Sequence, residues 1–468
     1  MDVLGTPNRN HTANIQKLLT KTLQKFNDKI IVLDDDPTGT QTVHGISVYT
    51  DWSEKTIESI FKNDTKIVYI LTNSRSFSVE KTVQIHQEIA IRIAKVSQKL
   101  GLSFVIISRG DSTLRGHYPI ETETLKRSLE STLPIKIDGE IICPAFFEGE
   151  RYTIDDVHYL KEKAELIPVG ETEFAKDQTF GFQSSNLQEY IKEKSGNKDV
   201  SIISIKLEEL KYENIDAIQE KLERVQKFQK IIVNAENYDQ LKIFAIALIR
   251  TMTTGKKFLF RTAASFPKVL GDITDQPYLN RNDIVKRTSQ TGGLIVIGSH
   301  VKLTTSQLNE LRRTAFSLQY VEFHVDAYFQ THSFKQEIER VFSQVEEYIR
   351  SGISVVLYTS RKLLLSDDVD KEKILEMSVS VSDALTKIVA KLEVAPKYII
   401  AKGGITSSDV ATKGLNITKA EVLGQIDSGI PVWRTDNESK FPAMPYLIFP
   451  GNVGTKTTLR KIVEMLEG

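Results

Sequence analysis

The 468-residue sequence predicts an α/β protein of two mostly parallel-sheet domains. Short apolar segments rich in β-branched residues alternate with amphipathic stretches of about 10–20 residues, the pattern of βαβ units. The chain is also longer than a single hydrophobic core usually supports. A segment rich in Pro, Gly and Asn, residues 262–293, interrupts the alternation as domain boundaries often do. We therefore expect domains at residues 1–280 and 281–468.

The first half begins with apolar residues at helical spacing over 12–27. Residues 30–33 are all apolar and mostly β-branched, which predicts a strand buried on both faces of a parallel sheet. Residues 144–185 scatter aromatic side chains among charges, and we expect long irregular loops there. The other expected strands are 46–49, 66–71, 104–107, 140–143, 200–205, 230–234 and 257–261, and the helices are 53–62 and 79–100.

The second half restarts the alternation with an apolar strand at 294–297. Further short apolar runs alternate with longer amphipathic stretches, so a second mostly parallel sheet is expected. The strands are expected at 321–325, 354–358, 398–401 and 447–449, and the helices at 304–316, 333–351, 370–392 and 455–467.

Composition excludes several classes of protein. Lys+Arg and Asp+Glu number 61 each, so the chain lacks the excess charge that attracts nucleic acid or a membrane surface. The apolar runs are too short to span a bilayer, and the first residues lack the basic and apolar regions of a signal peptide. A single cysteine, Cys143, rules out an intramolecular disulfide and fits a reducing compartment. We expect a cytoplasmic protein without nucleic-acid or membrane partners.

Three consecutive aspartates, Asp34, Asp35 and Asp36, follow the first predicted strand and enter a turn at Pro37-Thr38-Gly39. Ligands of open α/β sheets bind at the carboxyl ends of strands. A single aspartate there could simply stabilise the turn. Three adjacent carboxylates repel one another, however, and turn chemistry alone explains them poorly. The pattern predicts a functional site.

A second polar cluster, Asp111-Ser112-Thr113-Leu114-Arg115-Gly116, follows the strand at 104–107, and Arg75 and Arg109 also lie near strand ends. Arginine binds carboxylates or phosphates in a bidentate manner, and aspartate can deprotonate a hydroxyl. Individually these residues fit surface ion pairs or caps, and Glu121 fits the start of a helix. Their clustering favours a pocket for a small polyhydroxy acid.

Glycine turns follow three predicted strands of the second half, at Gly298-Ser299, at Gly403-Gly404-Ile405-Thr406 and at 451–454. Glycine lets the backbone approach a polyanion, and helix N-termini offer free N–H groups. One such turn is weak evidence, but three in one domain favour a nucleotide. Neither a Walker A sequence nor a dinucleotide fingerprint is present.

Two alternatives stay open. Asp34 and Asp36, with Thr38, also satisfy the nucleophile motif of a haloacid-dehalogenase-type phosphatase, in which Asp34 would attack phosphate. That interpretation leaves the segment 111–116 and the glycine turns unexplained. A non-catalytic sugar-acid sensor is the third interpretation, and the apolar Ile405 within a glycine turn favours it.

The aspartate turn, the segment 111–116 and the glycine turns occur along the chain in the order found in the four-carbon acid sugar kinase family. The sequence therefore resembles that family. The resemblance runs from about residue 30 to about residue 460. It implies an acid-sugar-binding N-terminal domain and an ATP-binding C-terminal domain, with the active site in an interdomain cleft. It also implies phosphorylation of a hydroxyl of a sugar acid such as threonate, erythronate or 3-oxo-tetronate, with ATP and Mg²⁺. The matching segments are 35–40, 75–76, 111–116, 144–146 with Arg151, 298–299, 403–406 and 451–454.

The resemblance also implies roles for individual residues. The ATP contacts would be Ser299, Gly403, Gly404, Ile405, Thr406 and Gly451, and the acid-sugar side would be Asp35, Asp36, Arg75, Asp111, Ser112, Arg115 and Arg151. Asp36 and Asp111 would be catalytic, one of them accepting the hydroxyl proton, and Asp35 would hold Mg²⁺. Arg115, helped by Arg75, would bind the substrate carboxylate. The expected partners are thus a sugar acid and ATP, and a homodimer is left open.

Overall fold

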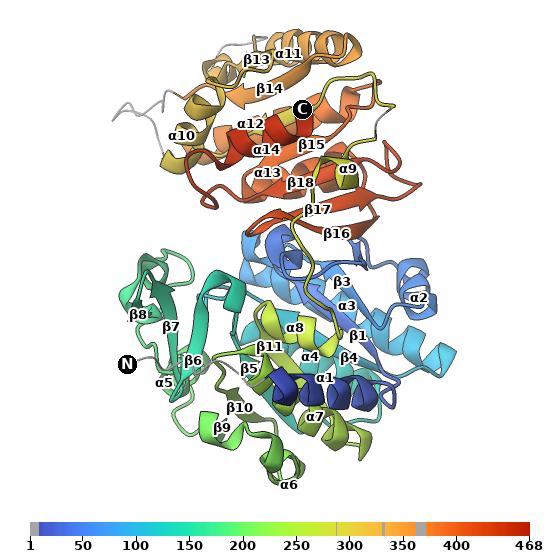
Figure 1. Ribbon diagram of the computed structural model, residues 1–468, viewed down its shortest axis with the longest axis vertical. Helices are drawn as coiled ribbons and strands as arrows, with labels where there is room; N and C mark the ends of the chain where they lie inside the picture. Colours follow the sequence, from blue (N-terminus) through green and yellow to red (C-terminus); the bar gives the residue numbers. More distant parts are fainter. Residues whose placement is uncertain (1–8, 287, 330–332, 362–370) are drawn as a thin grey trace. The chain divides into compact units, whose positions relative to one another are not determined.

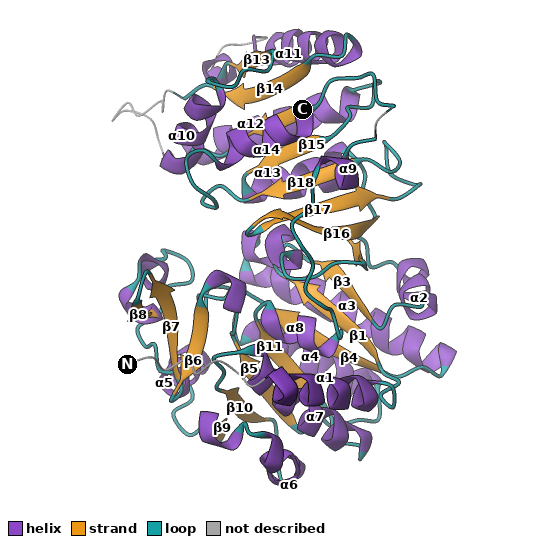
Figure 2. Cartoon of the chain, viewed as in Figure 1, coloured by secondary structure: helices purple, strands orange, loops and turns teal. Residues whose placement is uncertain are grey.

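The computed structural model describes residues 9–286, 288–329, 333–361 and 371–468. The chain divides into two compact units, each with helices around a sheet (Figure 1, Figure 2). The first unit comprises Met1–Thr42 and Asp51–Asp275, and the second comprises Val43–Thr50 and Gln276–Gly468. The predicted α/β class is confirmed. The units differ from the expected ranges chiefly in residues 43–50, which belong to the second unit.

The sheet of the first unit is parallel, in the order β3-β1-β4-β11-β5-β10-β9. Asp34 at the end of β1 pairs in register with Leu71 of β3 and Arg109 of β4. The three strands therefore end at the same level, which brings the polar segments that follow them together. The strands are β1 Lys29–Asp34, β3 Ile67–Leu71, β4 Phe104–Arg109, β5 Gly139–Cys143, β9 Ile202–Ile205, β10 Gln229–Val233 and β11 Phe258–Thr262.

Helices cover both faces of this sheet. α3 (Val79–Leu100) packs against α4 (Ile120–Thr132), and α7 (Tyr238–Thr253) packs against α1 (Arg9–Leu23) and α6 (Ile215–Glu223). The connections through α3 and α4 run along the sheet from β3 to β4 and on to β5, whereas those through α6 and α7 run back from β9 to β10 and β11. Because such crossovers are right-handed, the two pairs of helices lie on opposite faces. The remaining helices are α2 Glu54–Lys62, α5 Leu187–Ser195 and α8 Ser265–Leu270.

The prediction of irregular loops over 144–185 is wrong in part. An antiparallel sheet forms there from β6 (Arg151–Ile154), β7 (Val157–Glu162) and β8 (Glu165–Pro168). Asp155 and Asp156 both adopt positive φ, 49° and 63°, which is the geometry of a two-residue hairpin turn. Aspartate tolerates this conformation, so the hairpin needed no glycine to mark it in the sequence.

The second unit contains a mixed sheet in the order β13-β14-β12-β15-β18-β17-β16-β2. The first five strands are parallel, and the last three continue antiparallel. The hairpin β16–β17 was not predicted from the sequence, and β2, expected in the first domain, pairs with β16. The strands are β2 Ile46–Tyr49, β12 Leu294–Ile297, β13 Leu318–Phe323, β14 Ser354–Thr359, β15 Ile399–Lys402, β16 Lys419–Asp427, β17 Ile430–Thr435 and β18 Pro445–Phe449.

Helices α11, α12 and α14 lie within three residues of their expected bounds over the described residues, while residue 370 of the predicted third helix lies outside them. The helix expected at 304–316 ends at Leu311, and the short helices α9 and α13 were not predicted. Trp433, Tyr446 and Phe449 are fully buried in the core of this unit. Within the described ranges, no helix combines the length and the apolar composition that a membrane span requires. The helices are α9 Arg281–Ile284, α10 Lys302–Leu311, α11 Ser333–Arg350, α12 Lys371–Lys391, α13 Gly404–Asp409 and α14 Thr458–Glu467.

Candidate functional site

Asp34, the last residue of β1, is a buried supporting group. Its side chain is 1% exposed, and a Cβ added to Gly39 would lie 1.8 Å from its Oδ2. Arg109 Nη1 lies 3.4 Å from Asp34 Oδ1, yet burial outweighs this attraction and raises the pKa of Asp34 to about 7. A carboxylate enclosed in this way is inaccessible to a phosphate ester, which argues against Asp34 as a phosphatase nucleophile.

Asp35 is paired with Arg75. Arg75 donates from Nε to Asp35 Oδ2 at 3.0 Å and from Nη2 to Oδ1 at 2.6 Å, a bidentate contact with a carboxylate that is only 2% exposed. Burial raises the pKa of Asp35, and Arg75 opposes that rise. We expect Asp35 to hold Mg²⁺ directly or through water, and because Arg75 engages both of its oxygens, direct coordination fits poorly. Across the described residues, no group of three or more His, Cys, Asp or Glu side chains is placed to hold a metal ion.

Arg75 lies at the centre of three carboxylates. Besides Asp35, its Nη1 lies 3.6 Å from Asp36 Oδ2 and 3.5 Å from Asp111 Oδ1. The structure thus brings together the aspartate turn after β1 and the segment after β4, as the sequence predicts. The expected role of Arg75 in binding a substrate carboxylate does not fit this geometry, because its guanidinium already neutralises protein carboxylates.

The two predicted catalytic aspartates differ in their surroundings. Asp36 Oδ1 accepts hydrogen bonds from Thr38 N at 2.8 Å and Thr38 Oγ1 at 2.5 Å. Oδ2 accepts no hydrogen bond from the described residues and lies 3.6 Å from Arg75 Nη1. Asp111 Oδ2 accepts from Thr113 N, Thr113 Oγ1 and Arg115 Nε. Although burial opposes ionisation, Arg75 and Arg115 hold the pKa of Asp111 well below its usual range. Asp36, with its side chain 21% exposed, is the less committed of the two carboxylates.

A buried pair behind these groups, Glu121 and Arg261, was not recognised as part of the site. Arg261 Nη1 donates to Glu121 Oε2 and, at 3.1 Å, to Ser108 Oγ. Sequence analysis explained Glu121 by the start of a helix, but its side chain is buried among polar groups. Added Cβ atoms on Gly110 and Gly116 would lie 2.3 Å and 2.7 Å from Arg261 atoms. Gly110 and Gly116, at the two ends of the segment after β4, therefore leave the space that the Arg261 side chain occupies, and they were the sequence signal for a large side chain at this place.

The segment that follows the antiparallel sheet β6–β8 contributes an aromatic and an acidic side chain to the surroundings of Arg115. The Arg115 guanidinium lies 4.8 Å from the centroid of the Phe174 ring, and its Nη1 lies 3.7 Å from Asp177 Oδ2. Phe174 and Asp177 were not predicted as site residues. They follow an insertion that the sequence indicated only as loops.

Arg151, at the start of β6, differs from the other arginines of the site. Among the described residues it forms no ion pair with a carboxylate, its Nη1 donates to the Gly149 carbonyl, and its buried Nε has no acceptor. Burial lowers the pKa of Arg151, while the charges of Asp111 and Arg115 also act on it. Arg151 is thus a cation of the site with unused hydrogen-bonding capacity.

Ser112 anchors the second motif to the insertion through its backbone. The Ser112 carbonyl lies 2.7 Å from His158 Nε2, and His158 Nδ1 lies 3.0 Å from Thr153 Oγ1. Burial lowers the pKa of His158 to about 4, so this imidazole is neutral at pH 7 and donates from one ring nitrogen. The Ser112 side chain itself is buried.

The predicted nucleotide turns follow adjacent strands of the second unit, β12, β15 and β18, and they converge. A Cβ added to Gly298 would lie 2.3 Å from Thr406 Oγ1, and one added to Gly451 would lie 2.7 Å from Ser299 Oγ. Gly403 has φ 123°, and its added Cβ would lie 3.1 Å from Ser299 Cβ. The chain segments approach closely because these positions lack side chains, and the three turns together form a cradle in which Gly298, Ser299, Gly404 and Gly451 are partly exposed.

The last two predicted nucleotide contacts lie in the first turn of α13, which begins at Gly404. Ile405 is 63% exposed, so it is accessible to a ligand, and Thr406 is buried against Gly298. Sequence analysis missed Arg361, just after β14, which donates to the carbonyls of Ser299 and Ile297. No motif accompanies Arg361 in the sequence, so only the fold could reveal this cation.

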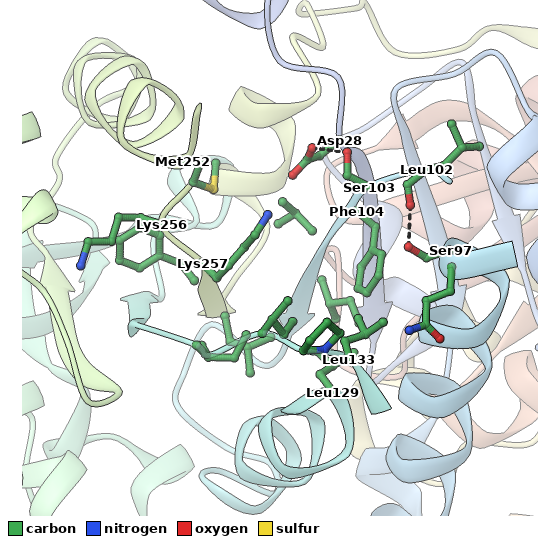
Figure 3. A pocket seen from close by; sticks show the side chains of 18 of the residues that line it. Asp28, Ser97, Leu102, Ser103, Phe104, Leu129, Leu133, Met252, Lys256 and Lys257 are labelled. Carbon is green, nitrogen blue, oxygen red and sulfur yellow. Dashed lines mark hydrogen bonds between the residues drawn. The ribbon is translucent and has the colours of Figure 1, made fainter. Parts of the chain in front are cut away.

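A cavity of about 410 Å³ lies elsewhere in the first unit, near the amino ends of β4 and β11 (Figure 3). Phe104, Leu129, Leu133 and Met252 contribute to a mainly apolar lining, and Asp28 accepts a hydrogen bond from Ser103 at its edge. None of the predicted site residues lines it. The polar cluster at the carboxyl ends of the strands is therefore the better candidate site.

Comparison with known families identifies a sugar-binding domain in the first half of the chain and a nucleotide-binding domain in the second half. A sugar-binding N-terminal domain model matches residues 30–270, and a nucleotide-binding C-terminal domain model matches residues 294–459. The chain belongs to the four-carbon acid sugar kinase family, which confirms the resemblance found in the sequence. No curated protein matches the chain.

Solved structures share the fold at low sequence identity. A Haemophilus influenzae protein has a TM-score of 0.61 at 16% identity, covering 93% of this chain and 100% of its own. A Salmonella typhimurium LT2 protein, provisionally described as a tRNA synthase, has a TM-score of 0.66 at 16% identity, with 93% and 98% covered. A Bordetella bronchiseptica protein, crystallised as a domain-swapped dimer with bound citrate, has a TM-score of 0.40 at 16% identity, with 94% and 98% covered. The first two likenesses support the fold.

Proposed function

We propose that this protein is an ATP-dependent kinase that phosphorylates a hydroxyl of a small, four-carbon-type sugar acid such as threonate, erythronate or 3-oxo-tetronate. One observation carries the proposal. The site contains a carboxylate oxygen that accepts no hydrogen bond from the described residues, Asp36 Oδ2, which lies 3.6 Å from Arg75 Nη1. It also contains the guanidinium of Arg151, whose Nε lacks an acceptor and whose charge interacts with that of Asp111. A hydroxyl and a carboxylate on one small molecule would satisfy both groups.

Arg151 and Arg115 are the proposed carboxylate ligands. Arg151 has no carboxylate partner among the described residues, and Arg115 keeps Nη2 available after its contacts with Asp111 and Asp177. Phe174 packs on the Arg115 guanidinium and limits its rotation. This arrangement orients the substrate before reaction, and positioning is a large part of phosphoryl-transfer catalysis.

Asp36 is the proposed proton acceptor. Thr38 fixes its carboxylate through Oδ1, so Oδ2 is presented in a defined direction. Asp111 is the weaker candidate because its pKa is depressed by two arginines, and a carboxylate of low pKa is a poor base. We assign Asp111 to holding Arg75 and Arg115 in place.

The second unit would bind ATP, which supplies the phosphoryl group when bound. The backbone N–H groups of residues 404–406 and Gly451, with the Ser299 hydroxyl, would contact the phosphates, since the N–H groups of Ser299 and Gly403 already donate to the Lys402 and Phe449 carbonyls. Arg361 adds positive charge beside Ser299. The cofactor proposal includes Mg²⁺, but the engaged oxygens of Asp35 make it a poor ligand. Mg²⁺ commonly binds through substrate phosphates with few protein carboxylates, so this finding is compatible with ATP as the donor.

The test is an ADP-release screen across four-carbon sugar acids and related acids with purified protein. We expect turnover with at least one sugar acid, and a loss of about 10²- to 10⁴-fold in kcat for Asp36→Asn, the range expected for a general base. Asp216→Asn is the matched control, because this carboxylate is exposed on α6 and pairs only with Arg250. Binding of a sugar acid without ADP release would favour a sensor. Hydrolysis of a phosphate ester that Asp34→Asn abolishes would favour a phosphatase.

A further inference from the structure

Lys402, the last residue of β15, is a fully buried lysine without an acidic partner. Its side chain is 0% exposed, and among the described residues it forms no ion pair with a carboxylate. Its Nζ donates to the Pro450 carbonyl at 2.9 Å and lies 3.7 Å from the centroid of the Phe449 ring. Lysine is almost never fully buried unless it is paired, so this position calls for an explanation.

The three glycine turns meet at Lys402. The residue immediately precedes Gly403, its amine binds the carbonyl that precedes Gly451, and its own carbonyl accepts a hydrogen bond from Ser299 N at 3.4 Å. No other described residue is hydrogen-bonded or directly joined to all three turns. A change in the charge of this amine would therefore act on the whole cradle at once.

The surrounding charges do not compensate for burial. The titratable or charged groups on the neighbouring elements are His300 after β12, Arg361 after β14, Asp409 on α13 and Tyr446 on β18. Asp409 is already paired with an exposed lysine, and none of these groups is a cause of the shift at Lys402. Burial alone lowers the pKa of Lys402 to about 7. Near neutral pH the amine is thus balanced between its charged and uncharged forms.

We propose that Lys402 is a proton-linked positioning residue, whose amine takes up a proton from solvent when nucleotide phosphates bind at the three glycine turns. The negative phosphates favour the ammonium form, and the ammonium holds the Pro450 carbonyl and steadies the turns in return. This inference rests on the proposed function, because it requires nucleotide at these turns. Its consequence is that nucleotide affinity falls as pH rises above about 7.

The test is titration calorimetry of the full-length protein with MgATP at pH 8 in buffers of different ionisation enthalpy. A group with a pKa of about 7 is mostly uncharged at pH 8, so wild-type protein should take up close to one proton per bound nucleotide. Between pH 7 and pH 9 the affinity should fall by up to about tenfold per pH unit. Lys402→Met should lose both effects. Lys413→Met, which removes an exposed lysine paired with Asp409, should retain them.

The outcomes separate this inference from the function on which it rests. Nucleotide binding by wild-type protein without proton uptake at pH 8 would overturn the inference, even if Lys402→Met fails to fold. Equal uptake by wild-type protein and Lys402→Met would also overturn it, because another group would then be titrating. If wild-type protein binds no nucleotide at any pH, the proposed function itself fails and this inference fails with it.

Discussion

Replacement of Arg151 by methionine should impair substrate recognition without affecting stability. Arg151 has no carboxylate partner among the described residues, so removing it leaves no buried acid unpaired. Its guanidinium lies 5.8 Å from the centroid of the Phe146 ring, and a methionine side chain can keep an apolar contact there. We expect the free energy of unfolding to change by less than about 1 kcal/mol.

The effect on the reaction follows from the hydrogen bonds that would be lost. Hydrogen bonds to charged groups contribute about 1.5–3 kcal/mol each, and two bonds from one guanidinium are not additive. A net loss of about 2–3 kcal/mol corresponds to a fall of about 30- to 150-fold in kcat/KM for the sugar acid. The KM for ATP should stay unchanged, because Arg151 lies in the first unit and the nucleotide turns lie in the second.

Steady-state ADP release with the acid and with the corresponding four-carbon polyol measures this effect directly. Wild-type protein should prefer the acid, and Arg151→Met should lose most of that preference, because the polyol has no carboxylate to bind. Arg151→Lys should recover part of it, since lysine keeps the charge without the planar fork. An unchanged acid-to-polyol ratio in Arg151→Met, with the protein folded, would refute the assignment of the carboxylate site.

Three further predictions concern other parts of the two units. Arg75→Met leaves Asp35 buried without its counterion and should lower the free energy of unfolding by roughly 3–5 kcal/mol in chemical denaturation, in contrast to Arg151→Met. A smaller loss than about 1 kcal/mol would contradict the buried pair. Burial raises the pKa of Asp34 to about 7 from 3.8, so the native state keeps a proton that the unfolded state has lost between about pH 4 and pH 7. Protonated Asp34 should therefore add to the free energy of unfolding as pH falls from 7 to 4, while His158, whose pKa burial lowers to about 4, subtracts from it. Asp34→Asn should make the free energy of unfolding fall more steeply towards pH 4 than in wild-type protein; an identical slope would exclude Asp34 as a contributor. Gly451→Ala places a Cβ 2.7 Å from Ser299 Oγ and should raise the KM for ATP roughly ten- to a hundredfold, with the KM for the acid as the internal control.

The sequence was most informative where polar residues follow buried strands. Asp34, Asp35 and Asp36 could be placed beside the segment 111–116 because parallel strands end at one edge of a sheet, and the register of β1 with β4 bears this out. The glycine turns were predictable for the same reason. Glycine at the end of a strand indicates a close approach of backbone or ligand, and in the structure it is other protein atoms that come close.

The arrangement of charges within the site was much less predictable. Sequence position cannot show that Arg75 is saturated by three carboxylates while Arg151 has none, because that difference depends on side-chain directions. Arg361 and Arg261 were missed because neither lies in a recognisable motif. The insertion was read as loops because its hairpin turn uses aspartates, and residues that only occasionally adopt positive φ give a weak turn signal.

Residues 43–50 have a consequence for dissecting the molecule into fragments. They follow the aspartate turn along the chain, yet β2 within them pairs with β16 and belongs to the second unit. A fragment starting at residue 276 would lack this strand and would expose the hydrogen-bonding edge of β16, which favours aggregation. A nucleotide-binding fragment would need residues 43–50 supplied as a separate peptide or fused to its end. The chain segment that directly follows the aspartate turn, which carries the proposed base, is therefore also required to complete the sheet of the second unit.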